Sequence, residues 1–123
     1  DSMKSRYAIW EAIEFNPDVA LYLDARMGGE QVTLYALNPS DVNAVDYYKA
    51  EALFPDEKGS ELPCAARTVI HPPALLAGRI IAEITRFARN LSCHTKIDEH
   101  VREAQLSITT LSTDGVLTFK YTN

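Results

Sequence analysis

The segment from Pro73 to about Asn90 constrains the fold most, because its residues have the spacing of a long amphipathic helix. Apolar side chains recur every three or four positions, and arginines and a glutamate occupy the other side. The recurring apolar residues are Leu76, Ile80, Ile84 and Phe87. Pro72 and Pro73 suit the first turn of a helix, where a missing amide donor costs little. We therefore expect this helix to cross a sheet.

Two segments early in the chain have the patterns of strands. Val19 to Leu23 is a nearly continuous apolar run, which is typical of a strand buried on both faces in a parallel sheet. After Gly28-Gly29, the segment from Gln31 to Leu37 alternates in character along its length, which predicts a second strand. The two strands would follow each other closely.

A hairpin is predicted at the end of the chain. The segments QLSITTL (105–111) and VLTFKY (116–121) both alternate between apolar and polar residues. They are separated by Ser112-Thr113-Asp114-Gly115, a sequence typical of a turn. Together with the predicted helices, this hairpin indicates an α/β fold with a mixed sheet.

Two shorter helices are also expected. The first covers Met3 to Phe15, with Ser2 as its N-cap, and Asn16-Pro17-Asp18 would end it. The second begins after Ser40, a plausible N-cap, and ends before Pro55.

Composition favours one soluble globular domain. The chain has 123 residues, of which 46% are hydrophobic and 24% charged. A formal charge of −5 argues against binding to nucleic-acid phosphates or to an anionic membrane. The two cysteines, Cys64 and Cys93, have no CxxC spacing, so a zinc ribbon or a disulfide framework is not expected and a reducing cytoplasm fits best. Because a polar cluster at Asp1 leads directly into a helical pattern, we expect a piece of a longer protein.

Several motifs resemble the ThiF/MoeB/HesA family of adenylating domains. The opening DSMKSR (1–6) resembles the D-N-x-x-x-R motif of that family, with Ser2 where asparagine is usual. The segment RMGGEQVTLYAL (26–37) is similar to its R-M-x-G-Q hairpin, with one extra residue. A short helix, LFPDE, a cysteine and the amphipathic helix then follow in the family's order. The resemblance covers Asp1 to Arg89 and implies the C-terminal half of a Rossmann-like domain, without its nucleotide-binding half.

The resemblance also implies a function. The whole domain would use ATP and magnesium to adenylate the terminal glycine of a ubiquitin-like or sulfur-carrier protein, and it would form a homodimer. Asp1 would help to hold magnesium and ATP, and Arg6 would bind a carboxylate or a phosphate. Cys64 would carry the acyl group afterwards as a thioester or persulfide. Because no G-x-G-x-x-G motif is present, the 123 residues alone are not expected to adenylate a substrate.

Three alternatives remain open from the sequence. Cys64 follows the aperiodic segment PDEKGSELP and is also consistent with a buried structural residue that closes this loop onto the core. The chain as a whole is also consistent with a non-catalytic interaction or dimerisation module in which the long helix forms the contact. The third alternative is an unrelated small α/β domain that matches the family by chance.

Other polar residues are interpreted as structural. The family's zinc-binding C-x-x-C is replaced by Lys49-Ala50-Glu51-Ala52, so no zinc site is expected. Cys93, His94 and His100 lack a fourth ligand for a tetrahedral metal site. His71, which precedes two prolines, is interpreted as a turn residue rather than a general base. The remaining loop carboxylates are interpreted as solvated charges: Asp24, Glu30, Asp56, Glu57 and Glu61.

Overall fold

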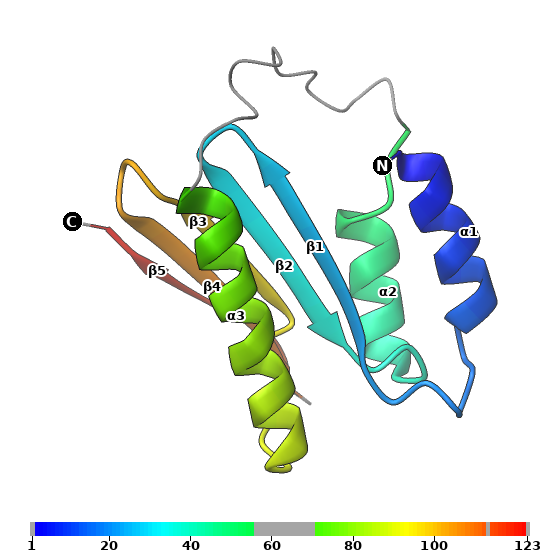
Figure 1. Cartoon of the computed structure of the whole chain (residues 1–123). Helices are drawn as coiled ribbons and strands as arrows, with labels where there is room; N and C mark the ends of the chain where they lie inside the picture. Colours follow the sequence, from blue (N-terminus) through cyan, green and yellow to red (C-terminus); the bar gives the residue numbers. More distant parts are fainter. Residues whose placement is uncertain (1, 56–70, 113, 123) are drawn as a thin grey trace.

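The computed structural model describes residues 2–55, 71–112 and 114–122, which form three helices and a five-stranded sheet (Figure 1). The elements, in chain order, are α1 (Met3–Ile13), β1 (Tyr22–Gly28), β2 (Gln31–Leu37), α2 (Val42–Glu51), α3 (His71–Ala88), β3 (Lys96–His100), β4 (Gln105–Ser112) and β5 (Gly115–Tyr121). An α/β fold is therefore confirmed.

The sheet is antiparallel throughout the described residues, so the prediction of a mixed sheet is wrong. Its strand order is β1-β2-β3-β4-β5, and each neighbouring pair is antiparallel. The physical reason is clearest for β1 and β2, which are joined by only Gly29 and Glu30. A connection of two residues allows only an antiparallel hairpin, and Gly29 has the positive φ of 60° that tight turns require.

The first strand also differs from its predicted position. The first three residues of the apolar run, Val19 to Leu21, have no regular secondary structure. β1 begins at Tyr22 and includes the polar residues Asp24 and Arg26. Strand β3 was not predicted, because its sequence KIDEH has a single apolar side chain, Ile97, and gives no alternating signal. The terminal hairpin of β4 and β5 is confirmed.

The helices agree more closely with the sequence. Ser2 caps α1, as predicted, and accepts a hydrogen bond from the Ser5 amide at 3.3 Å. The cap of α2 is Asp41 rather than Ser40, since its carboxylate accepts hydrogen bonds from the amides of Asn43 and Ala44. Helix α3 ends at Ala88, shortly before the predicted end at Asn90. No helix in the described ranges is long and apolar enough to cross a membrane.

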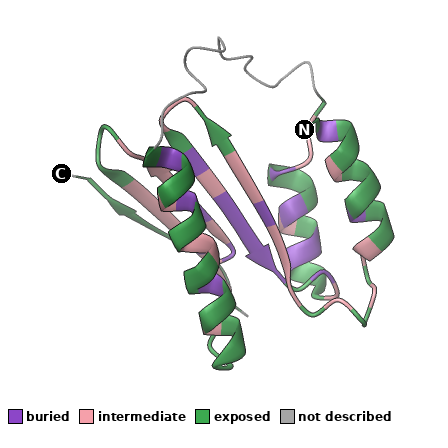
Figure 2. Ribbon diagram, in the orientation of Figure 1, coloured by how far each residue is buried: buried purple, intermediate pink, exposed green. Residues whose placement is uncertain are grey.

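Two apolar clusters lie on opposite faces of the sheet, because side chains alternate along β2. Val32 and Leu34 point to one face and pack with Leu76 of α3 and Ile97 of β3. Tyr35 and Leu37 point to the other face, where a second cluster joins α1 and α2 to the sheet. Its other buried members are Trp10, Ala44, Val45, Tyr48 and Ala52. Helix α3 therefore covers one face, and α1 and α2 cover the other (Figures 1 and 2).

Candidate functional site

A cavity of about 760 Å³ lies between the beginning of α1, the central strands and the segment after α2. Polar and charged side chains form much of its wall, and two of them are arginines. Its lining residues are Ser2, Met3, Arg6, Ala25, Arg26, Met27, Gly28, Gln31, Thr33, Tyr35, Glu51, Phe54, Lys96 and Asp98. A cavity of this size with a few polar groups is large enough for a small molecule or for the end of a peptide.

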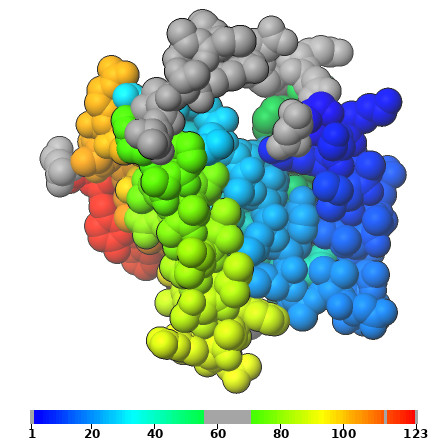
Figure 3. Space-filling model, viewed as in Figure 1, coloured from blue at the N-terminus to red at the C-terminus, as the bar shows by residue number. Residues whose placement is uncertain are grey.

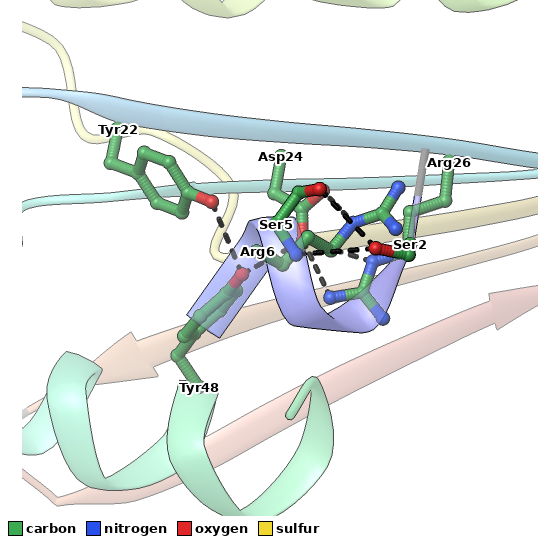
Figure 4. A network of polar contacts seen from close by, with 7 residues as sticks. All are labelled: Ser2, Ser5, Arg6, Tyr22, Asp24, Arg26 and Tyr48. Carbon is green, nitrogen blue, oxygen red and sulfur yellow. Dashed lines mark hydrogen bonds and ion pairs between the residues drawn. The ribbon is translucent and has the colours of Figure 1, made fainter. Parts of the chain in front are cut away.

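The buried carboxylate of Asp24 organises the arginines of this cavity (Figure 4). Nε of Arg6 donates to Oδ1 of Asp24 at 3.1 Å, and Nε of Arg26 donates to Oδ2 at 2.9 Å. Arg26 makes a second bond to Oδ2 through Nη2. One carboxylate therefore fixes the orientation of two guanidinium groups, one from α1 and one from β1.

Tyr48, a residue of α2, also binds the carboxylate of Asp24. Its ring is fully buried, and its hydroxyl donates to Oδ2 of Asp24 at 2.8 Å. Burial, the hydrogen bond with Tyr22 and the charge of Asp24 raise the pKa of Tyr48 above its usual value. The hydroxyl therefore remains protonated and acts as a donor to the carboxylate.

The Asp24 carboxylate is held in its charged form. Burial alone would raise its pKa, but hydrogen bonds and the positive charge from Arg26, with further bonds from Tyr48 and Arg6, lower the pKa below the usual range. Asp24 is therefore ionised at neutral pH and compensates the charges of the arginines.

We expect acid to destabilise the wild-type protein more than the Asp24→Asn variant. An unfolded aspartate has a pKa of about 3.9, and the folded value lies below it. The stabilisation from Asp24 is therefore fully present above the unfolded pKa and is lost as the pH falls through the folded pKa. Urea midpoints recorded by circular dichroism from about pH 5 to about pH 2 measure this loss. Equal acid sensitivity in both proteins would contradict it.

Aromatic rings hold the Arg26 guanidinium in place on the cavity wall. Its central carbon lies 5.1 Å from the ring centroid of Tyr35 and 5.7 Å from that of Phe54. On the other side of the cavity, Lys96 lies 5.7 Å from the Tyr35 ring and forms an ion pair with Asp98 at 2.9 Å. Planar guanidinium groups fixed in this way suit carboxylates and phosphates, which they can bind with two hydrogen bonds.

Of the three predicted site residues, the structure places one. Arg6 lies in the cavity and contacts Asp24, whereas Asp1 and Cys64 lie outside the described residues. The predicted magnesium ligand and the predicted acyl-transfer cysteine therefore stay predictions.

The interpretation of Asp24 as a solvated loop charge is wrong. Asp24 is 6% exposed and lies in β1, because this strand continues past the apolar run. Glu30 does lie in a turn, but it is partly buried and forms an ion pair with Arg102. The alternation of Tyr22, Asp24 and Arg26 is the sequence signal for this cluster, since alternate residues of a strand share one face. Asp56, Glu57 and Glu61 lie outside the described residues.

A second buried carboxylate belongs to α3 itself. Glu83 is 1% exposed, and its two oxygens contact Nδ1 of His94 at 2.6 Å and the His94 amide at 2.8 Å. The Cys93 thiol donates to the backbone oxygen of Glu83 at 3.6 Å, and burial and the Glu83 charge raise the pKa of Cys93. These contacts attach α3 to the segment before β3, so Cys93 and His94 have structural partners.

His71 is the first residue of α3 rather than part of a turn before it, and its Nε2 lies 3.9 Å from Oε1 of Glu30. No group of three or more His, Cys, Asp or Glu side chains in the described ranges is arranged to hold a metal ion.

No protein-family model, curated protein or solved structure matches this chain.

Proposed function

We propose that the chain is the C-terminal part of a ThiF-type adenylating domain. The longer protein would use ATP and magnesium to activate the C-terminal glycine of a ubiquitin-like or sulfur-carrier protein. This proposal depends on the family resemblance, and fold similarity alone does not prove a reaction.

The observation that supports it most is that three separate motifs of the resemblance line one cavity. The motif DSMKSR contributes Ser2, Met3 and Arg6. The motif RMGGEQ contributes Arg26, Met27, Gly28 and Gln31. LFPDE contributes Phe54, which stacks against Arg26. Motifs of one functional site are expected to lie together in the folded chain, whereas motifs that match by chance are not.

The side chains of the cavity suit the anionic groups of an adenylation reaction. In that reaction the glycine carboxylate attacks the α-phosphate of ATP, an acyl-adenylate forms, and pyrophosphate leaves. Arg6 and Arg26 would hold the carboxylate or a phosphate, and Asp24 would keep both arginines in position. Magnesium would neutralise phosphate charge. The proposed magnesium ligand is Asp1, as the family resemblance implies.

An uncovered apolar surface beside β1 is also consistent with the proposal. Ile81 and Ile84 of α3 are 64% and 46% exposed. Arg79 of the same helix forms an ion pair with Glu99 of β3, so the Arg79 side of α3 is turned toward β3. Ile81 and Ile84 lie on the opposite side of the helix, which is turned toward the β1 edge of the sheet. Met27 of β1 is also 56% exposed. A nucleotide-binding half that packed against this edge would cover these side chains.

The test is ATP–pyrophosphate exchange by the protein that carries this chain together with the sequence encoded before Asp1. A panel of ubiquitin-like proteins ending in Gly-Gly provides the second substrate. The proposal predicts exchange that is lost in Asp1→Ala and kept in Cys64→Ala, with later transfer lost in the cysteine variant. If no partner supports exchange, the chain is better explained as a non-catalytic interaction module.

Replacing Arg26 with alanine is expected to reduce exchange on the order of 100-fold, since one positioned donor to a developing charge contributes about that much. Arg26→Lys keeps the charge but loses the paired hydrogen bonds, so it should restore only a small part of the activity. Arg102→Ala is the matched control, because this exposed arginine pairs with Glu30 outside the cavity. Folding of each variant is checked by circular dichroism. Full activity in folded Arg26→Ala would exclude a role for this residue in the reaction.

A further inference from the structure

One face of the sheet carries a row of polar side chains that crosses all five strands. Residues that lie directly opposite each other in an antiparallel sheet point to the same face. The strand registers connect one residue of each strand, and we call these five the polar row: Arg26, Thr33, Asp98, Ser107 and Lys120. The hydroxyl of Thr33 donates to Oδ1 of Asp98 at 2.6 Å, as expected for neighbours on one face. The row therefore joins β1 to β5 without an apolar side chain in between.

The opposite face of the sheet is apolar and has its own cover. The neighbouring row on that face consists of Ala25, Leu34, Ile97, Ile108 and Phe119. Helix α3 lies over this face and packs against Leu34 and Ile97 (Figures 1 and 3). The polar row is thus confined to the face that α3 does not cover.

Two hollows lie over the polar row and meet at its centre. The first is the cavity that contains Arg6 and Arg26, called the arginine cavity below, and it is lined by the first three members of the row. The second has a volume of about 310 Å³ and is lined by the last three members. Asp98 therefore lines both hollows, and so does Gln31. A ligand that leaves the arginine cavity along this face is led from β1 toward β5.

The far end of the row carries a cation that no carboxylate neutralises. Asp98, in the middle of the row, forms an ion pair with Lys96 at 2.9 Å. Lys120 is exposed and makes no ion pair with another described residue. Complementary charge is a common source of specificity in recognition. The β5 end of the row therefore favours a ligand with a negative group at this place.

The length of the row sets how far this negative group lies from the arginine cavity. Four strand spacings of about 4.8 Å, or about 19 Å in all, separate Arg26 from Lys120. An extended chain advances about 3.3 Å per residue, so about six residues span this distance.

We propose that the tail of the partner protein lies along the polar row, and that Lys120 selects an acidic side chain about six residues before the terminal glycine. This inference rests on the proposed function, in which Arg6 and Arg26 hold the terminal carboxylate. An acidic side chain midway along the tail would lie near Asp98 instead, so the place of the charge matters as well as its sign. Lys120 lies beyond Arg89, where the family resemblance ends, so the selectivity comes from this chain's own C-terminal strands.

Fluorescence anisotropy of labelled peptides, with the longer protein that carries this chain, tests the inference. The peptides are ten residues of glycine and serine that end in Gly-Gly, with one glutamate at the third, sixth or ninth place from the end. All three have the same charge. We expect the peptide with glutamate at the sixth place to bind about threefold more tightly than the others, which is the size of an exposed ion pair. High salt should remove the difference.

Variants of Lys120 assign the preference to this side chain. Lys120→Gln should abolish it, and Lys120→Glu should transfer it to a peptide with lysine at the sixth place. Lys49→Gln is the matched control and should keep the preference, because this exposed lysine pairs with Glu14 and lines neither hollow. Equal affinity of the three peptides for the wild type, or a preference that survives in Lys120→Gln, would overturn the proposal.

Amidation of the terminal glycine separates this inference from the proposed function. If the free carboxylate binds more tightly than the amide but the place of the glutamate has no effect, the arginine cavity holds the end of the tail and only the role of Lys120 is wrong. If amidation has no effect either, Arg6 and Arg26 do not hold the carboxylate, and the inference fails together with that part of the proposed function.

Discussion

Replacing Asp24 with alanine is expected to destabilise the protein by about 3–5 kcal/mol, which is typical when one partner of a buried ion pair is removed. The side chains of Arg6 and Arg26 are only 14% and 15% exposed, and both form ion pairs with Asp24. Without the carboxylate, two largely buried cations lose a compensating charge. The buried Tyr48 hydroxyl also loses its acceptor at 2.8 Å.

Urea unfolding followed by fluorescence measures this loss, because Trp10 is the single tryptophan and packs directly against Tyr48. Asp24→Asn keeps the shape of the side chain but loses its charge, so it should fall between the wild type and Asp24→Ala. Glu14→Gln provides the control, at an ion pair whose lysine is exposed. It removes an ion pair with Lys49 at 2.8 Å, but the lysine side chain is 53% exposed, so the midpoint should not move.

A small effect of Asp24→Ala, similar to that of Glu14→Gln, would mean that the arginines reach solvent when the carboxylate is absent. In that case Asp24 would not be the group that positions them. The expected order of urea midpoints is wild type and Glu14→Gln together, then Asp24→Asn, then Asp24→Ala.

The sequence predicted those parts of the fold in which periodicity and local turns agree. β2, the terminal hairpin and α3 all have several apolar residues at regular spacing, and all three were found near their predicted positions. Strand direction was harder to predict. The apolar run from Val19 to Leu23 indicated a parallel strand, but the two-residue turn at Gly29 and Glu30 determines the pairing, and it allows only a hairpin.

The site was only partly predictable, because its central residue, Asp24, is polar and its contact partners are distant along the sequence. Arg6 was identified through a motif, and it does lie in the cavity. Asp24 was missed, because an aspartate between an apolar run and a glycine pair resembles a loop charge. Its partners Arg6 and Tyr48 lie 18 and 24 positions away, and only the folded chain brings them together. Buried polar clusters are generally recognised by such contacts, not by composition.

Replacing Trp10 with alanine is expected to cost about 3–5 kcal/mol and to release α1 from the rest of the protein. Trp10 is 2% exposed, and its ring centroid lies 4.4 Å from that of Tyr48 and 5.6 Å from that of Tyr22. Met3 is the other buried residue of α1, and the ion pair of Arg6 with Asp24 is a further attachment of this helix. Loss of the indole ring would leave a large cavity next to Tyr48.

Circular dichroism in urea gives the stability of the Trp10 variants, and hydrogen exchange shows whether the α1 amides lose protection first. Trp10→Phe should cost less, because it keeps an aromatic contact and removes an indole N–H that finds no acceptor among the described residues. Ile9→Ala is the matched control on the same helix, since Ile9 is 50% exposed. Because α1 carries Ser2, Met3 and Arg6 into the cavity, its release would also remove one wall of the proposed site. If Trp10→Ala cost no more than Ile9→Ala, the attachment of α1 would depend on contacts other than this ring.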